Sequence, residues 1–247
     1  MLKGAKRPKC FLVGALVIAL SLTILPANLW AGDDLNDQEI IKRFIHIFYK
    51  SEAWAKTKWL GIDSLQFPSD NWVVQEIIFE TKPDYVIETG TFRGGTALFF
   101  ATILEKVNEG GKVITVDIDP QIDEVSHIKL FKERVEVIKG DSVSPEIMDA
   151  ISKKVKGRRV LVFLDSLHKK DHVLKELTLY SKFVSINSYI IVADTSLDIY
   201  GLEPGFGPGP MEAVKEFLIT HENFKIDHSR EKFLATFFPS GFLKRIK

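Results

Sequence analysis

The sequence predicts a doubly wound α/β domain built on a mostly parallel sheet, and two observations support this fold class. From Pro83 onward, short apolar stretches alternate with amphipathic ones, as in a chain whose strands are each followed by a helix. The apolar stretches are rich in Val and Ile on both faces, which is typical of parallel strands covered by helices on both sides. The expected strands are Tyr85–Thr89, Val113–Asp117, Val135–Ile138, Val160–Asp165 and Tyr189–Asp194.

Hydrophobic periodicity also places the helices and the last strands. Two late strands, near Phe224–Asp227 and Phe233–Phe238, have no helix between them, so we expect an antiparallel hairpin at the sheet edge. Ahead of the sheet, residues 37–59 and Trp72–Glu80 are predicted helices joined by a polar link. Further helices are expected at Thr96–Val107, near Ile122–Phe131, and at Pro145–Val155, Asp171–Phe183 and Met211–Thr220.

Composition narrows the function classes. The chain has 247 residues, 45% of them hydrophobic, with 33 basic and 33 acidic residues and one cysteine. A single cysteine excludes an intramolecular disulfide framework, and no Cys/His spacing indicates a structural zinc site. Zero net charge argues against a dedicated nucleic-acid binder, which normally carries a basic surplus.

Residues 1–31 differ in character from the rest of the chain. A basic start is followed by an uncharged run from Cys10 to Ala31, which is typical of a secretory signal or a membrane anchor. We expect the protein at a membrane through residues 11–31 or, alternatively, exported after cleavage. The side of the membrane stays open. The chain then divides into residues 1–31, a helical extension at 32–81 and the α/β domain at 82–247.

Acidic residues stand at the end of every predicted strand of the parallel core. They are Glu88, Asp117 with Asp119, Asp141, Asp165 and Asp194. In a doubly wound sheet, ligands bind at the carboxyl ends of the strands, where these side chains meet. The sequence therefore places the functional site at this edge of the sheet.

The first strand leads into a glycine-rich turn that spans Glu88–Thr96. Its three glycines let the backbone approach a ligand and open the next helix. The dinucleotide pattern is absent, because Thr91 and Phe92 stand where its second glycine is required. Glu88 suits a ligand with a cationic amino group, and the alternative is a purely structural strand-to-helix turn.

The next two strand ends indicate an adenosine-containing ligand. A carboxylate at the position of Asp117 can accept both hydroxyl groups of a ribose. Asp119 is the alternative, although its place further into the loop favours solvation. Asp141 and Ser142 follow the third strand, where side chains can contact an adenine amino group. The alternative there is an Asp-Ser cap for the helix near Pro145.

These motifs carry a resemblance to a known family. The strings V-I-E-T-G-T-F-R-G-G-T-A-L-F-F, L-D-S-L-H-K-K-D-H-V-L-K-E-L and G-P-G-P-M-E-A-V resemble the cephalosporin hydroxylase / rhamnosyl O-methyltransferase family, which has the class I S-adenosylmethionine-dependent methyltransferase fold. The likeness covers about residues 70–240. It implies O-methyl transfer from S-adenosylmethionine, often with a divalent metal, to a hydroxyl of a small molecule or a glycolipid sugar.

The resemblance also implies roles for single residues. The family's fifth strand typically ends in two consecutive acidic residues that share a metal, but here Ala193 precedes Asp194. Asp165 and Asp194 are then the expected ligands of Mg²⁺, and whether a metal is bound stays open. The implied cofactor-binding residues, from the methionine end to the ribose and adenine, are Glu88, Gly90, Thr91, Gly94, Asp117, Asp141, Ser142 and Asp165.

Methyl transfer from a sulfonium is an in-line displacement that needs aligned reactants and a base for the acceptor hydroxyl. His168 is the first candidate for this base, because imidazole titrates near neutral pH, and Lys169 is the second. The alternative for His168 is a helix-start residue bonded to the backbone. The loop Gly205–Pro210 is a candidate lid over the acceptor.

The main alternative to an enzyme is a non-catalytic scaffold that keeps the fold. Ala193 and the N-terminal segment favour it, because S-adenosylmethionine is made in the cytosol. The expected partners are an acceptor and a membrane, with no nucleic acid. The identity of the acceptor and the formation of a homo-oligomer stay open.

Overall fold

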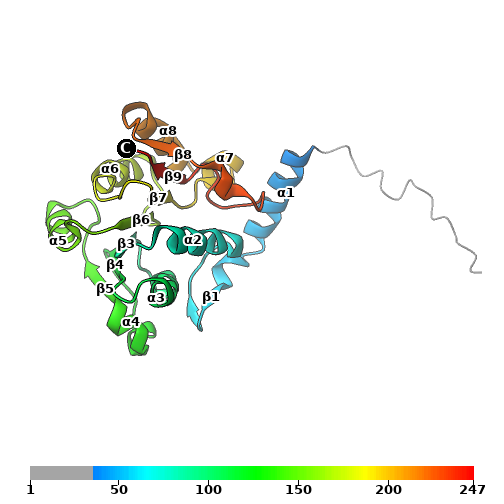
Figure 1. Ribbon diagram of the computed structural model, residues 1–247. Helices are drawn as coiled ribbons and strands as arrows, with labels where there is room; N and C mark the ends of the chain where they lie inside the picture. The colour runs from blue at the N-terminus through cyan, green and yellow to red at the C-terminus, as the bar shows by residue number, and fades with distance from the viewer. Residues whose placement is uncertain (1–35) are drawn as a thin grey trace, which may run out of the picture. The chain divides into compact units, whose positions relative to one another are not determined.

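The structure, a computed structural model, describes residues 36–247, and residues 37–247 form one compact unit (Figure 1). The predicted signal or anchor at residues 1–31 lies outside the described residues. Within residues 36–247, no helix is both long enough and apolar enough to cross a membrane.

A seven-stranded sheet organises this unit in the order β5-β4-β3-β6-β7-β9-β8. The strands from β5 to β7 are parallel, and β9 runs antiparallel to both β7 and β8. The strand order reverses between β3 and β6, and a crevice forms at the carboxyl ends of the strands at such a point. The bounds are β3 Tyr85–Thr89, β4 Lys112–Asp117, β5 Val135–Lys139, β6 Val160–Leu164, β7 Tyr189–Val192, β8 Phe224–Ile226 and β9 Phe242–Arg245.

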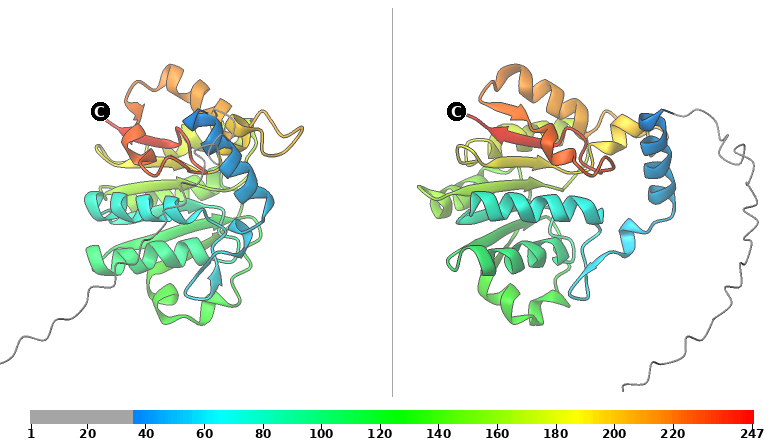
Figure 2. Two further views of the ribbon diagram at one scale, coloured as in Figure 1. Left: turned by 90° about the vertical axis from the view of Figure 1, so that its right-hand side faces the viewer. Right: turned by 45° about the vertical axis from the view of Figure 1, so that its right-hand side comes forward.

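Helices cover both faces of the sheet (Figure 2). Alternate residues of each strand divide between two hydrophobic cores, as the pleat requires: Val86 lies in the first core and Ile87 in the second. The first core takes residues from α1 Asp37–Lys50, α2 Pro68–Thr81, α3 Gly95–Val107 and α4 Lys129–Arg134. The second takes residues from α5 Pro145–Val155, α6 Lys170–Tyr180 and α8 Pro210–Thr220. The doubly wound prediction is therefore confirmed.

The predicted helix over residues 37–59 is wrong beyond Lys50, where α1 ends. A single 3-10 turn follows at Trp54–Lys56, and the chain then forms a small hairpin from β1 Lys58–Trp59 and β2 Ile62–Asp63. Leu60 and Gly61 both have positive φ, which is the backbone of the tight turns that join two antiparallel strands. The hydrophobic pattern of α1 continues into this segment, so periodicity alone does not reveal the break.

The predicted strand at Phe233–Phe238 is also wrong, because the last strand is β9. Leu234 has positive φ, and Pro239 cannot donate to a strand ladder. Phe237 and Phe238 are apolar because they fill the first core from a loop. The predicted antiparallel pairing at the sheet edge is confirmed, with β9 as the partner of β8.

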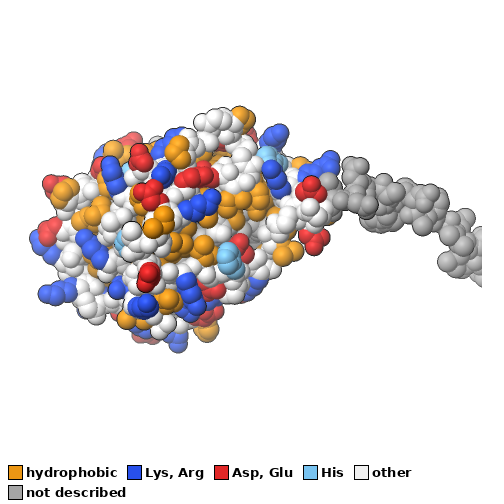
Figure 3. Space-filling view, turned by 90° about the horizontal axis from the view of Figure 1, so that it is seen from above, with side chains coloured by type: hydrophobic (Ala, Val, Ile, Leu, Met, Phe, Trp, Pro, Cys, Tyr) orange, Lys and Arg blue, Asp and Glu red, His pale blue; other side chains and the backbone are white. Residues whose placement is uncertain are grey.

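Smaller differences concern short elements. The helix expected near Ile122–Phe131 is a 3-10 turn at Val125–His127 followed by α4, and α7 Ser196–Tyr200 was not predicted. On the face that Figure 3 shows, acidic and basic side chains are interspersed without a large region of one charge.

Candidate active site

A cavity of about 630 Å³ opens at the carboxyl ends of the parallel strands. Its size lies within the roughly 300–1,000 Å³ of small-molecule and cofactor sites. Among the described residues that line it there are five aspartates, two histidines and no Lys or Arg. Asp117, Asp141, Asp165 and Asp194 are four of the predicted strand-end acids, so the cavity lies at the edge of the sheet where the sequence predicts the functional site.

The glycine-rich turn between β3 and α3 brings two backbones into close contact. Gly90 has φ +90°, and a Cβ at this position would lie 2.0 Å from the carbonyl oxygen of Asp165. Only glycine therefore allows the end of β3 to approach the end of β6 in this way. Gly94 does not line the cavity; it begins α3 in a left-handed conformation and packs against Val125 and Phe131.

Glu88 lies beneath the cavity and does not line it, because its side chain is fully buried. Its Oε2 accepts a hydrogen bond of 2.5 Å from the Thr115 hydroxyl, which also bonds Thr91 in the cavity wall at 2.6 Å. Its Oε1 has no partner among the described residues. Burial raises the pKa of Glu88 to about 8, and the Asp117 charge adds to this shift.

Asp117 is held with its carboxylate at the cavity wall. Its Oδ2 accepts the backbone N–H of Phe92 at 2.8 Å, and its Oδ1 accepts the backbone N–H of Asp119 at 2.8 Å. Asp119 does not line the cavity; its side chain is 76% exposed and pairs with Lys139. The geometry therefore favours Asp117 over Asp119 for a ribose.

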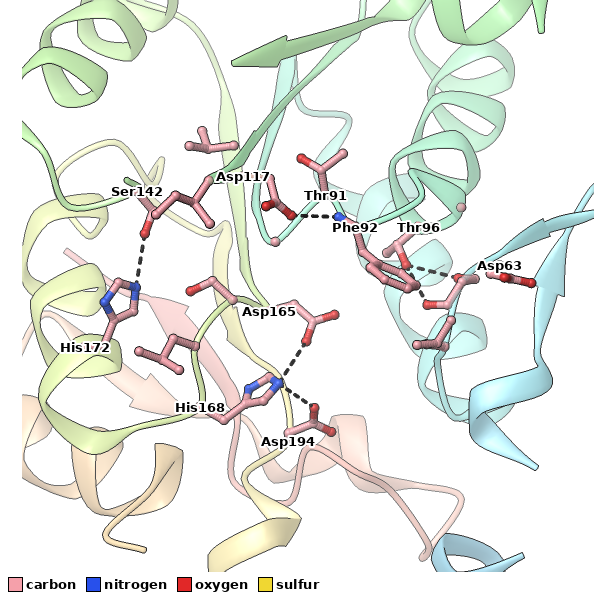
Figure 4. A pocket seen from close by; sticks show the side chains of 18 of the residues that line it. Asp63, Thr91, Phe92, Thr96, Asp117, Ser142, Asp165, His168, His172 and Asp194 are labelled. Carbon is pink, nitrogen blue, oxygen red and sulfur yellow. Dashed lines mark hydrogen bonds and ion pairs between the residues drawn. The ribbon is translucent and has the colours of Figure 1, made fainter. Parts of the chain in front are cut away.

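Asp141 and Ser142 lie at the cavity end near α6. The cap of α5 is Ser144, whose Oγ accepts the backbone N–H of Ile147, so the capping role proposed for Asp141 belongs to Ser144. The hydroxyl of Ser142 donates to Glu176 at 2.6 Å and lies 3.2 Å from Nε2 of His172. Figure 4 shows Ser142 and His172 facing each other across this end of the cavity.

Glu176 and His172 are residues that the sequence interpretation missed. Glu176 is fully buried, and its Oε1 accepts the Ser142 hydroxyl and, at 2.8 Å, the Ser166 hydroxyl. It thereby ties the loop after β5 to the loop after β6. The hydrogen bond from His172 to Glu176 raises the pKa of His172. The spacing i, i+4 on a helix was the available signal, because it puts both side chains on one face.

Asp165, His168 and Asp194 form a second cluster in the cavity wall (Figure 4). One ligand atom from each lies within 4.8 Å of the others. Nε2 of His168 is 3.2 Å from Asp194 and 4.0 Å from Asp165, and Gln66 donates to Asp165 at 2.6 Å. Burial, followed by the charges of Asp194 and Glu88, raises the pKa of Asp165 well above its usual value. Burial also raises the pKa of Asp194.

The cluster fits a divalent cation. Carboxylate oxygens suit Mg²⁺ and Mn²⁺, and imidazole is a common ligand of the transition metals. Two carboxylates whose pKa values are raised by burial are stabilised in their ionised form by a cation between them. Ala193 is buried in the first core, so the second acidic position of the family pattern contributes no ligand here.

The second candidate base is placed less well. Nζ of Lys169 lies 4.0 Å from the centroid of the Phe206 ring, and Lys169 does not line the cavity. The loop that contains Phe206 packs on the start of α6, where Pro208 accepts the backbone N–H of Lys170. No residue from Gly205 to Pro210 lines the cavity, so the expected lid lies beside the site in this structure.

The segment before α2 contributes a wall that sequence motifs did not indicate. Trp54, Asp63, Ser64 and Leu65 line the cavity. This segment passes close to α3, since a Cβ on Gly95 would lie 2.2 Å from the carbonyl oxygen of Asp63. Leu65, like Phe92 and Asp194, has positive φ, a strained backbone of the kind that gathers at functional sites.

The polar groups of the cavity also fit S-adenosylmethionine. This molecule is a cation with a ribose, an adenine and an ammonium group, and the described cavity wall offers carboxylates without a competing Lys or Arg. The unpartnered Oε1 of Glu88 is a buried polar atom beneath the glycine turn. An unpaired buried polar atom is costly, so a hydrogen-bond partner from a ligand or a water would stabilise it.

Known proteins share both the sequence and the fold. The sequence model of the family described as Rhamnosyl O-methyltransferase/CmcI matches residues 51–246. The rhamnosyl O-methyltransferase of Mycobacterium tuberculosis is 36% identical over 207 residues, which cover 80% of this chain and 82% of that protein. The corresponding protein of Mycobacterium leprae is 34% identical over 207 residues and covers 80% and 87%.

Among solved structures, the Mg-SAM structure of CmcI aligns with a TM-score of 0.58 at 17% identity. The alignment covers 78% of each chain, and at this identity it shows the shared fold. The extent of the family match and the identity to the mycobacterial proteins are decisive. The chain belongs to the Rhamnosyl O-methyltransferase/CmcI family and is an S-adenosylmethionine-dependent O-methyltransferase.

Proposed function

We propose that this O-methyltransferase methylates a hydroxyl of a sugar, either free or as part of a glycolipid. The observation that carries the proposal is the Asp165–His168–Asp194 cluster, which lies in the same cavity as the strand-end acids Asp117 and Asp141. A cofactor site and a group able to take a proton therefore share one cavity. The relatives named rhamnosyl O-methyltransferases support a sugar as the acceptor.

In the proposed arrangement the cofactor lies along the strand ends. Asp117 accepts the ribose hydroxyls, while Asp141 and Ser142 contact the adenine. The methionine part follows the glycine turn at Gly90 and Thr91, above Glu88. All of these cofactor-binding residues except Glu88 line the cavity, which supports their roles. Glu88 acts from beneath the cavity through its unpartnered Oε1.

The acceptor hydroxyl then lies beside Asp165 and His168. Its oxygen forms a bond to the methyl carbon, the C–S bond breaks with its electron pair on sulfur, and the hydroxyl proton passes to Nε2 of His168. The flanking carboxylates of Asp165 and Asp194 stabilise the resulting imidazolium, because opposite charges lie within 4.0 Å. A divalent cation held by Asp165 and Asp194 would lower the pKa of the hydroxyl.

Methyl-labelled S-adenosylmethionine and methyl α-L-rhamnopyranoside test this function directly. We expect mass spectrometry to find the labelled methyl on the pyranoside together with one S-adenosylhomocysteine per methyl transferred. Chelation with EDTA should slow the reaction and added Mg²⁺ should restore it. Transfer to catechol and to none of a panel of pyranosides would contradict the sugar assignment.

We also propose that residues 1–31 bring the protein to a membrane. The uncharged run after a basic start supports this, and so does the exposed apolar stripe of α1, where Ile40, Phe44 and Ile47 follow at helical spacing. The full chain should sediment with membranes, whereas a chain that starts at Gly32 should not. Full-length protein in the soluble fraction would contradict the proposal.

Self-association of the protein stays a prediction. Light scattering, which measures the mass of the particle in solution, tests it.

A further inference from the structure

The cavity wall farthest from Ser142 and His172 is built by the segment before α2. In Figure 4, Asp63 of this segment lies on the far side of the cavity from Ser142 and His172, and Asp165 lies between them. The adenine end and the N-terminal wall are therefore at opposite ends of the site. Whatever lies against this wall is on the side of Asp165 that faces away from Ser142 and His172.

Trp54 is the aromatic residue of this wall whose ring is fixed by its surroundings. Its indole N–H donates to the carbonyl of Tyr49 at 3.1 Å. The Tyr49 ring stacks on it with centroids 5.5 Å apart and planes 14° from parallel. One ring face and the only polar atom are thus occupied, so the surface that Trp54 offers the cavity is aromatic carbon.

Hydrogen bonds fix the place of Trp54 relative to the reacting cluster. The hydroxyl of Thr57 donates to the carbonyls of Trp54 and Gln66 at 2.9 and 3.1 Å. The side chain of Gln66 in turn donates to Asp165. On the other side, Tyr49 bonds Glu203, and the charge of Asp194 contributes to the raised pKa of Tyr49 after burial and Glu203.

The chemistry of a pyranose matches these features. Its ring presents one face of C–H bonds, which packs on aromatic carbon, and hydroxyls around its edge, which bond carboxylates and imidazole. The described wall contains no Lys or Arg to bind a phosphate or a carboxylate on the acceptor. An uncharged sugar therefore suits this side of the cavity better than an anionic one.

We infer that Trp54 is the stacking platform of the acceptor site, and that it holds an uncharged pyranose ring with one hydroxyl turned towards Asp165 and His168. This inference rests on the proposed sugar methylation and adds the residue that recognises the ring. Trp54 acts on binding of the acceptor, and S-adenosylmethionine is bound by the strand ends without it.

The test compares Trp54→Ala, Trp54→Phe and a control, Trp72→Ala, with methyl α-L-rhamnopyranoside as the probe. Trp72 is exposed on α2 and does not line the cavity. We expect Trp54→Ala to raise the KM for the pyranoside at least about tenfold, with the Kd of S-adenosylmethionine unchanged. Trp54→Phe should retain most of the affinity, and Trp72→Ala should match the parent protein.

A KM that stays unchanged in Trp54→Ala would overturn the inference, and so would a parallel loss of S-adenosylmethionine binding. Saturation-transfer NMR gives a readout that does not depend on turnover: pyranoside ring protons should receive transfer in the parent and not in Trp54→Ala. If the parent shows no such transfer, the stacking role of Trp54 is overturned. Binding of S-adenosylmethionine would still support the proposed function in that case. Failure to bind S-adenosylmethionine is the separate failure of the proposed function.

Discussion

Glu88 shows how a single buried acid reports on the ligand above it. Its pKa of about 8 means that the folded protein without ligand holds it mostly protonated at neutral pH. The ammonium group of S-adenosylmethionine favours the ionised form, so binding releases this proton below about pH 8 and not above it.

We therefore expect the affinity for S-adenosylmethionine to rise by up to about tenfold per pH unit as the pH increases towards 8. Titration calorimetry from pH 6 to 8 measures this slope. Glu88→Gln should reduce the slope, and Asp119→Asn should leave it unchanged. An undiminished slope in Glu88→Gln would place the cofactor's amino group elsewhere.

His168 is the residue with the clearest kinetic prediction. It lies between two carboxylates in the cavity wall, and a positioned base contributes about 10²–10⁴-fold to a rate. His168→Ala should slow methyl transfer within this range and leave the Kd of S-adenosylmethionine unchanged. Lys169→Ala is the matched control, and it should stay within a few-fold of the parent because Lys169 packs on Phe206. Equal losses in both variants would remove His168 from its proposed role.

At the scale of elements, the turn between β3 and α3 depends on a close backbone approach. Gly90 and Gly61 have nearly the same φ, +90° and +89°, but a Cβ on Gly61 would have no atom within 4 Å. Gly61→Ala should therefore cost only the left-handed backbone strain, about 1–2 kcal/mol. Gly90→Ala should cost more and weaken cofactor binding, because its Cβ would overlap the carbonyl of Asp165. Equal costs in denaturant unfolding would contradict this explanation.

Asp70 ties α2 to the loop that was wrongly predicted as a strand. Its carboxylate accepts the Thr236 hydroxyl at 2.5 Å and the Phe237 N–H at 2.8 Å, and burial raises its pKa to about 7. The folded chain therefore binds more protons than the unfolded chain between about pH 4 and 7. Stability from this group is fully present below about pH 4 and is lost as the pH rises to about 7.

Asp70→Asn should accordingly remove the part of the fall in thermal midpoint with rising pH that Asp70 contributes over this window. The measurement is thermal unfolding of the parent and variant at several pH values, with Asp119→Asn as the control at an exposed site. The contrary outcome is a parent midpoint that rises with pH across the window, together with a smaller rise in the variant. It would show that Asp70 is ionised in the folded protein.

The sequence predicts some elements correctly and others wrongly, because apolar side chains in different elements pack for different reasons. The five parallel strands carry Val and Ile on both faces, so their pattern is not shared by surface segments. Residues 51–63 and 233–238 carry apolar side chains for a different reason, since they pack as loops or a short hairpin against the first core. Their periodicity imitates a helix or a strand, and only tertiary contacts with Asp70 and α3 decide their shape.

At the scale of the whole molecule, one part of the site is predictable from the sequence and the other part is not. The strand-end acids follow from the fold class, because parallel strands deliver their carboxyl ends to one edge. The N-terminal wall with Trp54 and the Glu176 network come from contacts between segments far apart in sequence. No local pattern encodes such contacts.

The most direct test of the central claim is calorimetric titration of S-adenosylmethionine into the protein, beside the variants Asp117→Ala and Asp119→Ala. Asp117 is the last residue of β4 and Asp119 lies two residues later, but of the two only Asp117 lines the cavity. A micromolar Kd in the parent, kept in Asp119→Ala and lost in Asp117→Ala, is the predicted result. No binding to the parent, or equal binding to both variants, would contradict a cofactor site at the strand ends.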